Sequence, residues 1–176
     1  MEMCALVGAV LGAGSDTAVD LHSYLIKNLL QHPEELESLK EDPDLVQGAI
    51  SETLRYESSG KTGLARYASE DIEINGNHVK KGQMVQLITS TAGMDSSIYH
   101  NPRKFNIQRD HDKSISFGQG PHYCIGVTLV RSQTEVMLKE LFKRFPNLSL
   151  GDEIVYDYNH HNARRMDVMT VNTNLS

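Results

Sequence analysis

The chain has 176 residues, of which 39% are apolar, and this length and composition suit one globular domain with a buried core. Its formal net charge is -6, with 17 lysines and arginines against 23 acidic residues, so it lacks the basic surface that neutralises nucleic-acid phosphates. No uninterrupted apolar run reaches the roughly 18 residues of a membrane span, and Met1 to Cys4 lacks the basic segment of a signal peptide. We therefore expect a cytoplasmic protein with neither a nucleic-acid nor a membrane partner.

The first part of the chain predicts helices. Apolar residues recur at helical spacing over residues 4–32, and Pro33 ends that segment because its ring cannot continue a helix. Three glycines inside the segment each cost about 1 kcal/mol of helix propensity, so either the helix is locally distorted or something other than helix stability favours them. They are Gly8, Gly12 and Gly14. Residues 33–57 then predict two shorter helices, the second introduced by Asp42-Pro43-Asp44.

The middle and the tail of the chain predict strands separated by loop and helix. Short, turn-bounded segments over residues 62–88, with Asn75-Gly76 as a hairpin signal, predict a small antiparallel sheet. Residues 93–126 have mainly the composition of a loop, residues 125–144 predict a last helix, and residues 150–174 predict another hairpin. We therefore expect a mainly α fold with a small antiparallel β-sheet.

Cysteine and histidine positions indicate which side chains carry chemistry. Cys4 and Cys124 are more often free than paired in a chain of this kind, and Cys4 lies in an apolar stretch where a buried, inert thiol is expected. The pair His160-His161 has no second ligand cluster at metal spacing, so we expect a solvated turn there. Only Cys124 remains as a candidate for chemistry.

Cys124 lies in the glycine-rich string FGQGPHYCIG, at residues 117–126 and at the start of the last predicted helix. Amide N–H groups and the positive end of the helix dipole stabilise a thiolate at such a position. Glycines let the backbone approach a bulky planar ligand closely, and this string contains Gly118, Gly120 and Gly126. A lone cysteine after a glycine-rich loop is, however, equally consistent with a structural thiol.

The complete string resembles the haem-binding loop of cytochromes P450, Phe-x-x-Gly-x-x-x-Cys-x-Gly, at every fixed position. Residues 13–17, AGSDT, resemble the oxygen-activation motif of that family, and residues 52–55, ETLR, resemble its Glu-x-x-Arg motif. The three motifs follow in the family's order. The chain is therefore similar to the carboxyl-terminal half of a bacterial soluble P450, and the resemblance implies that the amino-terminal half of the fold is absent.

The resemblance implies how haem b would be bound. Cys124 would be the axial ligand of the haem iron, whose electron donation favours O–O cleavage. Arg66 in the first strand and His122 in the loop would bind haem propionates, although an edge-strand arginine and a loop histidine are the plainer alternatives. The remaining cofactor-binding positions in the loop are Phe117, Gly118 and Gly126.

The resemblance also implies catalytic and structural roles. Asp16 and Thr17 would relay protons to bound dioxygen, in a helix that opens at this point in the family; the alternatives are a solvated acid and a helix threonine bonded to a carbonyl one turn back. Glu52 and Arg55 would form a buried ion-pair network that holds the cysteine loop. Lys104 stands where the family often has an arginine, and a lysine cannot make a bidentate pair with a carboxylate. Arg109 could therefore be the third member of the ion-pair network.

Three hypotheses about function follow from the resemblance. The first is a haem-thiolate monooxygenase that inserts one oxygen atom of dioxygen into a small organic substrate, with electrons from a ferredoxin or flavodoxin. The second is an inactive truncated remnant, or a haem-binding or interaction module, whose exposed apolar faces favour association with the missing half or with itself. The third is a peroxygenase that uses peroxide and needs no redox partner.

Overall fold

The structure is a computed structural model that describes residues 2–60, 63–160 and 163–174. Residue 62, the predicted first residue of the β region, and His161 lie outside these described residues. The first helices are α1 (Glu2–Gln31), α2 (Pro33–Glu41), the 3₁₀ turn η1 (Pro43–Leu45) and α3 (Val46–Tyr56). Pro33 occupies the first turn of α2, and the Asp42 carboxylate accepts a hydrogen bond of 3.1 Å from the amide of Asp44. The predicted caps therefore form, although η1 delays the start of α3 to Val46.

The strands form three separate antiparallel pairs. They are β1 (Leu64–Tyr67) with β4 (Met84–Leu87), β2 (Ile72–Ile74) with β3 (Asn77–Val79), and β5 (Ser149–Asp157) with β6 (Arg165–Asn172). Asn75 and Gly76 form the predicted turn with φ values of 48° and 79°. The single sheet predicted over residues 62–88 is thus two short sheets in one ribbon. Between them Ala68 bonds to both Gly82 and Gln83, at 2.8 and 3.0 Å, outside the regular ladders.

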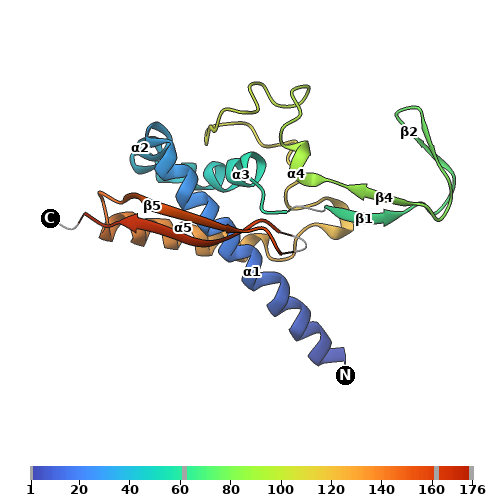
Figure 1. Ribbon diagram of the computed structural model, residues 1–176, viewed down its shortest axis with the longest axis horizontal. Coiled ribbons are helices and arrows are strands. Elements are labelled where there is room, and N and C mark those ends of the chain that lie inside the picture. Colours follow the sequence, from blue (N-terminus) through green and yellow to red (C-terminus); the bar gives the residue numbers. More distant parts are fainter. Residues whose placement is uncertain (1, 61–62, 161–162, 175–176) are drawn as a thin grey trace.

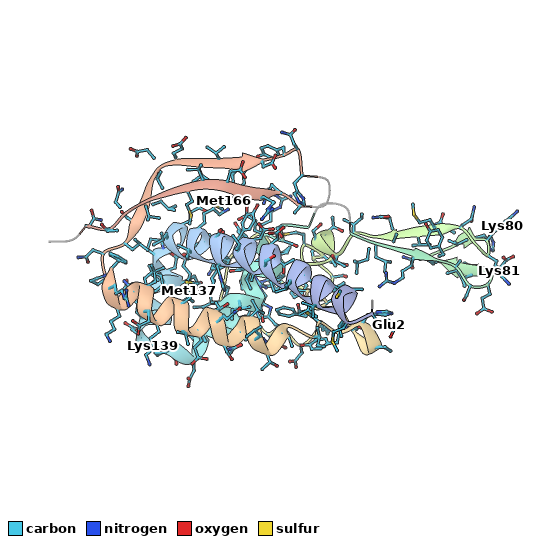
Figure 2. All side chains as sticks on the ribbon, turned by 90° about the horizontal axis from the view of Figure 1, so that it is seen from below. Glu2, Lys80, Lys81, Met137, Lys139 and Met166 are labelled. Atoms are coloured by element: carbon cyan, nitrogen blue, oxygen red, sulfur yellow. The ribbon has the colours of Figure 1, made fainter. Side chains whose placement is uncertain are left out.

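Long loops and two helical segments connect these strands. They include α4 (Thr89–Ala92), the 3₁₀ turn η2 (Gly120–His122) and α5 (Val127–Arg144). Figure 2 shows the β5–β6 hairpin on one side of α1 and α5 on the other, whereas the far end of the β1–β4 ribbon, where Lys80 and Lys81 follow β3, projects away from the helices. The fold is mainly α with small antiparallel sheets, as predicted.

The core lies where the second half of α1 packs against α2, α3 and α5 (Figure 1). Its fully buried side chains come from these helices and from the loop after α4; they are Leu25, Leu29, Ala49, Ile50, Phe105 and Ile107. Gly48 permits the loop to approach α3, because an added Cβ would lie 2.0 Å from the carbonyl oxygen of Ile107. The core therefore fixes the loop that leads to Cys124 against α3.

The first half of α1 lies outside this core. Large apolar side chains from Met3 to Leu11 are exposed, and the helix runs without interruption past all three glycines, each of which faces open space. The local distortion considered for this segment is absent, because α1 is a single α-helix from Glu2 to Gln31. Cys4, expected to be a buried thiol, is exposed because nothing in the described residues packs on this half of the helix.

The same helix is long and apolar enough to cross a membrane by length and composition alone. No uninterrupted apolar run was expected here and none is needed for this criterion, because averaged hydropathy tolerates the glycines and few charges within the helix. Core helices of soluble proteins and signal sequences meet it too, so this is weak evidence for a span.

Candidate functional site

The cysteine loop is a compact turn directly before α5. The Cys124 amide donates to the carbonyl of Phe117 over 2.8 Å, and the Tyr123 amide donates to that of Gly120 over 3.0 Å. Gly118 has a φ of 77°, where a side chain is strained, and an added Cβ would lie 3.0 Å from the carbonyl oxygen of His122. Gly118 is therefore required by the turn itself.

Gly126 serves the loop differently. Its φ of -84° is ordinary, and it precedes the first residue of α5, which begins at Val127 rather than at Ile125 as predicted. An added Cβ at Gly126 would lie 3.8 Å from Sγ of Cys124, so the space that this glycine leaves is beside the sulfur. The loop thus presents its sulfur on an uncrowded backbone at the amino-terminal end of a helix.

The exposed groups of this loop fit a haem. Cys124 is a free, exposed thiol, and the apolar side chain of Ile125 beside it is 96% exposed. A thiolate can hold haem iron as the protein ligand, and an apolar neighbour suits a planar macrocycle. Among the described residues no group of three or more His, Cys, Asp and Glu could hold a bare metal ion.

A cavity of about 620 Å³ lies against the same loop, with Phe117, Gly118 and Gly120 in its wall. The Arg131 guanidinium lies over the Phe117 ring, 5.6 Å from its centroid, and also lines this cavity. Cys124 does not line this cavity. The cavity is therefore separate from the candidate haem ligand.

The oxygen-activation residues lie on the exposed part of α1. The Thr17 hydroxyl donates to the carbonyl of Ala13, one turn back, over 2.7 Å. The Asp16 carboxylate, 61% exposed, pairs with Arg165 of β6 at 3.3 Å. In the described part of the chain the Asp16 and Thr17 side chains are not bonded to each other. The structure thus orients them toward different partners.

Glu52 and Arg55 form a buried ion pair on α3. Nε and Nη2 of Arg55 each lie 2.7 Å from a different oxygen of the Glu52 carboxylate, and both side chains are almost fully buried. Nη1 of Arg55 donates to the carbonyls of Gly93 and Pro102, both at 2.7 Å. Because Glu52 also accepts from the Asn106 amide at 2.8 Å, the pair ties α3 to the loop that precedes Cys124.

Arg109 is the third member of this network. Its Nε lies 3.2 Å from Oε2 of Glu52, and its guanidinium donates to the carbonyls of His100 at 2.7 Å and Lys104 at 3.0 Å. The structure therefore brings the three network candidates together, while Lys104 contributes its backbone.

Sequence reasoning missed His111, which faces the network from the loop. Its side chain is 11% exposed, and its Nε2 lies 3.6 Å from Oε2 of Glu52, beyond hydrogen-bond length. Burial lowers the pKa of His111, and the neighbouring Glu52 carboxylate only partly opposes this effect. No periodic pattern marks a loop histidine, so the sequence contains no local signal for its burial.

The two candidates for propionate binding are both exposed. Arg66 lies in β1, opposite Val85 of β4, and its guanidinium donates to the neighbouring carbonyl of Ala65 at 2.9 Å. His122 ends the η2 turn, two residues before the cysteine. Both remain free to meet an external anionic group.

Comparisons with known proteins identify the family. The cytochrome P450 family model matches residues 43–153. The chain is 38% identical over 170 residues to the epothilone C/D epoxidase of Sorangium cellulosum and 44% identical over 140 residues to the biotin biosynthesis cytochrome P450 of Bacillus subtilis, covering 97% and 80% of this chain. The chain belongs to the cytochrome P450 family.

The fold agrees with that family. The epothilone D-bound structure of cytochrome P450epoK superposes with a TM-score of 0.89 at 38% identity, over 94% of this chain and 41% of that one. The chain spans 40% of the length of the epoxidase and 35% of that of the biotin-biosynthesis relative. The similarity therefore covers nearly all of this chain but less than half of a relative.

Proposed function

We propose that this chain provides the haem-thiolate site of a P450 monooxygenase, with Cys124 as the ligand of haem b. The observation that carries the proposal is the exposed Cys124 thiol on a tight glycine loop at the start of α5. Amide groups and the helix dipole favour a thiolate there. When bound, the haem supplies the activation of dioxygen, which no amino-acid side chain provides.

The other site residues would bind the haem or support the loop around it. Arg66 and His122 would bind its propionates, since both are exposed and are or can become cationic. Phe117, Gly118 and Gly126 would shape the loop around it. Glu52, Arg55 and Arg109 would keep the loop in place through the ion pairs that they form with one another.

Asp16 and Thr17 would move protons beside the haem. A carboxylate that is 61% exposed can exchange protons with solvent, and a hydroxyl can hold water and pass a proton on. The reaction would insert one oxygen atom of dioxygen into a small organic substrate. A ferredoxin or flavodoxin would supply the electrons, in the cytoplasm.

The exposed first half of α1 supports a site that further protein segments complete. Its apolar side chains, from Met3 to Leu11, would face further segments of a P450 fold, either in a longer form of this chain or in another chain. The same exposure supports the second candidate, a haem-binding or interaction module that lacks a complete substrate pocket and associates with itself.

Titration of the purified chain with haem, followed by Soret absorbance, tests the proposal. Wild type should bind one haem, whereas Cys124→Ser should bind it more weakly and with an altered spectrum. Cys4→Ser is the matched control, because Cys4 is also free and exposed. Equal binding by wild type and Cys124→Ser, or no binding by either, would refute Cys124 as the ligand in this chain.

A further inference from the structure

The cavity beside the cysteine loop has a polar wall to which no role has yet been assigned. Its volume of about 620 Å³ lies within the range of small-molecule pockets, roughly 300–1,000 Å³. Three segments meet in its wall: Ser51 of α3, several residues between 111 and 123, and Arg131 of α5. Because Cys124 is not part of that wall, the cavity is a candidate site that is separate from the proposed haem ligand.

Arg131 carries a charge that no acidic side chain neutralises within the described part of the chain. Its guanidinium lies over the Phe117 ring, 5.6 Å from the centroid, and its Nε is buried without a hydrogen-bond partner among the described residues. A buried donor that stays unpaired costs free energy, and the group that pairs best with a guanidinium is an oxyanion. Arg131 therefore indicates an anionic ligand in this cavity.

Two further donors line the same cavity. Both ring nitrogens of His111 are buried and have no hydrogen-bond partner among the described residues, since even Oε2 of Glu52 is 3.6 Å from Nε2. The Ser116 hydroxyl accepts a bond of 3.1 Å from the Ser114 hydroxyl, which leaves its own proton to donate elsewhere. The wall thus offers a guanidinium, an imidazole N–H and a hydroxyl, a set that suits an anion with several oxygens.

Two carboxylates lie near these donors. Glu52, next to His111, is already paired with Arg55 and Arg109. Asp112 lines the cavity itself, but its side chain is exposed, so water and salt screen its repulsion of an anion. The acidic groups therefore lower the affinity for an anion without cancelling the attraction of Arg131.

We propose that this cavity binds a small organic phosphate, with the phosphate group at Arg131, Ser116 and His111. The cavity is much larger than a phosphate ion, and the rings of Phe117 and Tyr123 in its wall provide apolar surface for the organic part. Such a ligand would bridge α5 and the loop that precedes Cys124. The site needs no haem, so it stands or falls independently of the proposed function.

Nitrogen-15 NMR of the whole chain, titrated with phenyl phosphate, tests the proposal. The Ser116 amide signal should shift and saturate, whereas sodium chloride of equal ionic strength should produce no saturating shift. Arg131→Gln should weaken binding about tenfold or more, and Arg131→Lys less, because lysine keeps the charge but not the planar fork. Arg144→Gln is the matched control, since Arg144 forms an exposed ion pair with Glu140 elsewhere on α5. Unchanged binding by Arg131→Gln would overturn the proposal.

Asp112→Asn guards against a variant that merely fails to fold. Removing this like charge should strengthen phenyl phosphate binding about two- to five-fold, a gain that a misfolded protein would not show. Weaker binding by Asp112→Asn would contradict the placement of the phosphate group. Inorganic phosphate should bind more weakly than phenyl phosphate, because it leaves the two rings uncovered. Equal affinity for both would overturn the organic phosphate as the ligand.

Discussion

Arg55 donates two hydrogen bonds of 2.7 Å to the carboxylate of Glu52, one turn away on α3, and both side chains are buried. Removing one partner of a buried pair leaves the other charge uncompensated, which costs about 3–5 kcal/mol. We predict that Glu52→Gln lowers the free energy of unfolding by about this amount, as measured by chemical denaturation.

The control for this variant is Glu37→Gln. Glu37 also pairs with a cation three residues away, Lys40 at 2.8 Å, but it is exposed. Its loss should cost less than about 1 kcal/mol. Similar losses for Glu52→Gln and Glu37→Gln would contradict the buried network.

Arg109 and Lys104 should differ sharply in their contribution to stability. Arg109 bonds to Glu52 and to three loop carbonyls, whereas Lys104 is exposed and enters the network through its carbonyl. Arg109→Ala should cost roughly 2–3 kcal/mol because it removes a cation that bonds to the buried Glu52 carboxylate, and Lys104→Ala should stay within about 0.5 kcal/mol. Thermal unfolding of the two variants under one set of conditions checks this. A larger loss for Lys104→Ala would mean that its side chain, not Arg109, is the third arm.

Acid should destabilise the chain through two buried histidines. Burial lowers the pKa of both His22, bonded to Thr134 at 2.9 Å, and His111, from an ordinary value of 6.5. The unfolded chain therefore takes up protons at a higher pH than the folded one, so stability is full above the unfolded value and falls as pH drops below it. The free energy of unfolding should decline from about pH 7 to about pH 5.5.

The variant His111→Gln should make that decline shallower, because it removes one of the two histidines whose pKa is lowered by burial in the folded protein. An unchanged slope in His111→Gln would show that folding does not lower the pKa of this histidine.

Thr17→Ala separates dioxygen chemistry from peroxide chemistry. The variant loses one hydrogen bond to Ala13 at an exposed position, so its stability should change little. If Thr17 carries protons, haem-loaded Thr17→Ala should lose about 100-fold or more of dioxygen-dependent turnover while keeping peroxide-dependent turnover. Equal losses with both oxidants would argue against proton relay, and peroxide turnover alone in wild type would favour the peroxygenase.

Local signals predicted the features that neighbouring residues determine. Pro33 ends α1, and Asn75-Gly76 forms the hairpin turn, since each restricts its own backbone. The fold class followed from these elements together with the three motifs.

Contacts between distant segments were not predictable in the same way. The pairing of Asp16 with Arg165 depends on where the carboxyl-terminal hairpin docks, and the burial of His111 depends on the path of a loop. Neither is recorded in a local pattern. The glycines of α1 predicted a weak helix. The helix is nevertheless continuous, because propensity costs of this size do not break a helix of 30 residues.

The reduced carbon monoxide difference spectrum of the haem-loaded chain tests the central claim most directly. The Soret band of the carbon monoxide complex would depend on which protein side chain holds the haem iron, so it reports whether that side chain is a thiolate. We predict a red-shifted band in wild type and in Cys4→Ser that is absent from Cys124→Ser. A band that survives in Cys124→Ser, or a wild-type spectrum without the red shift, would show that Cys124 does not ligate haem iron in this protein.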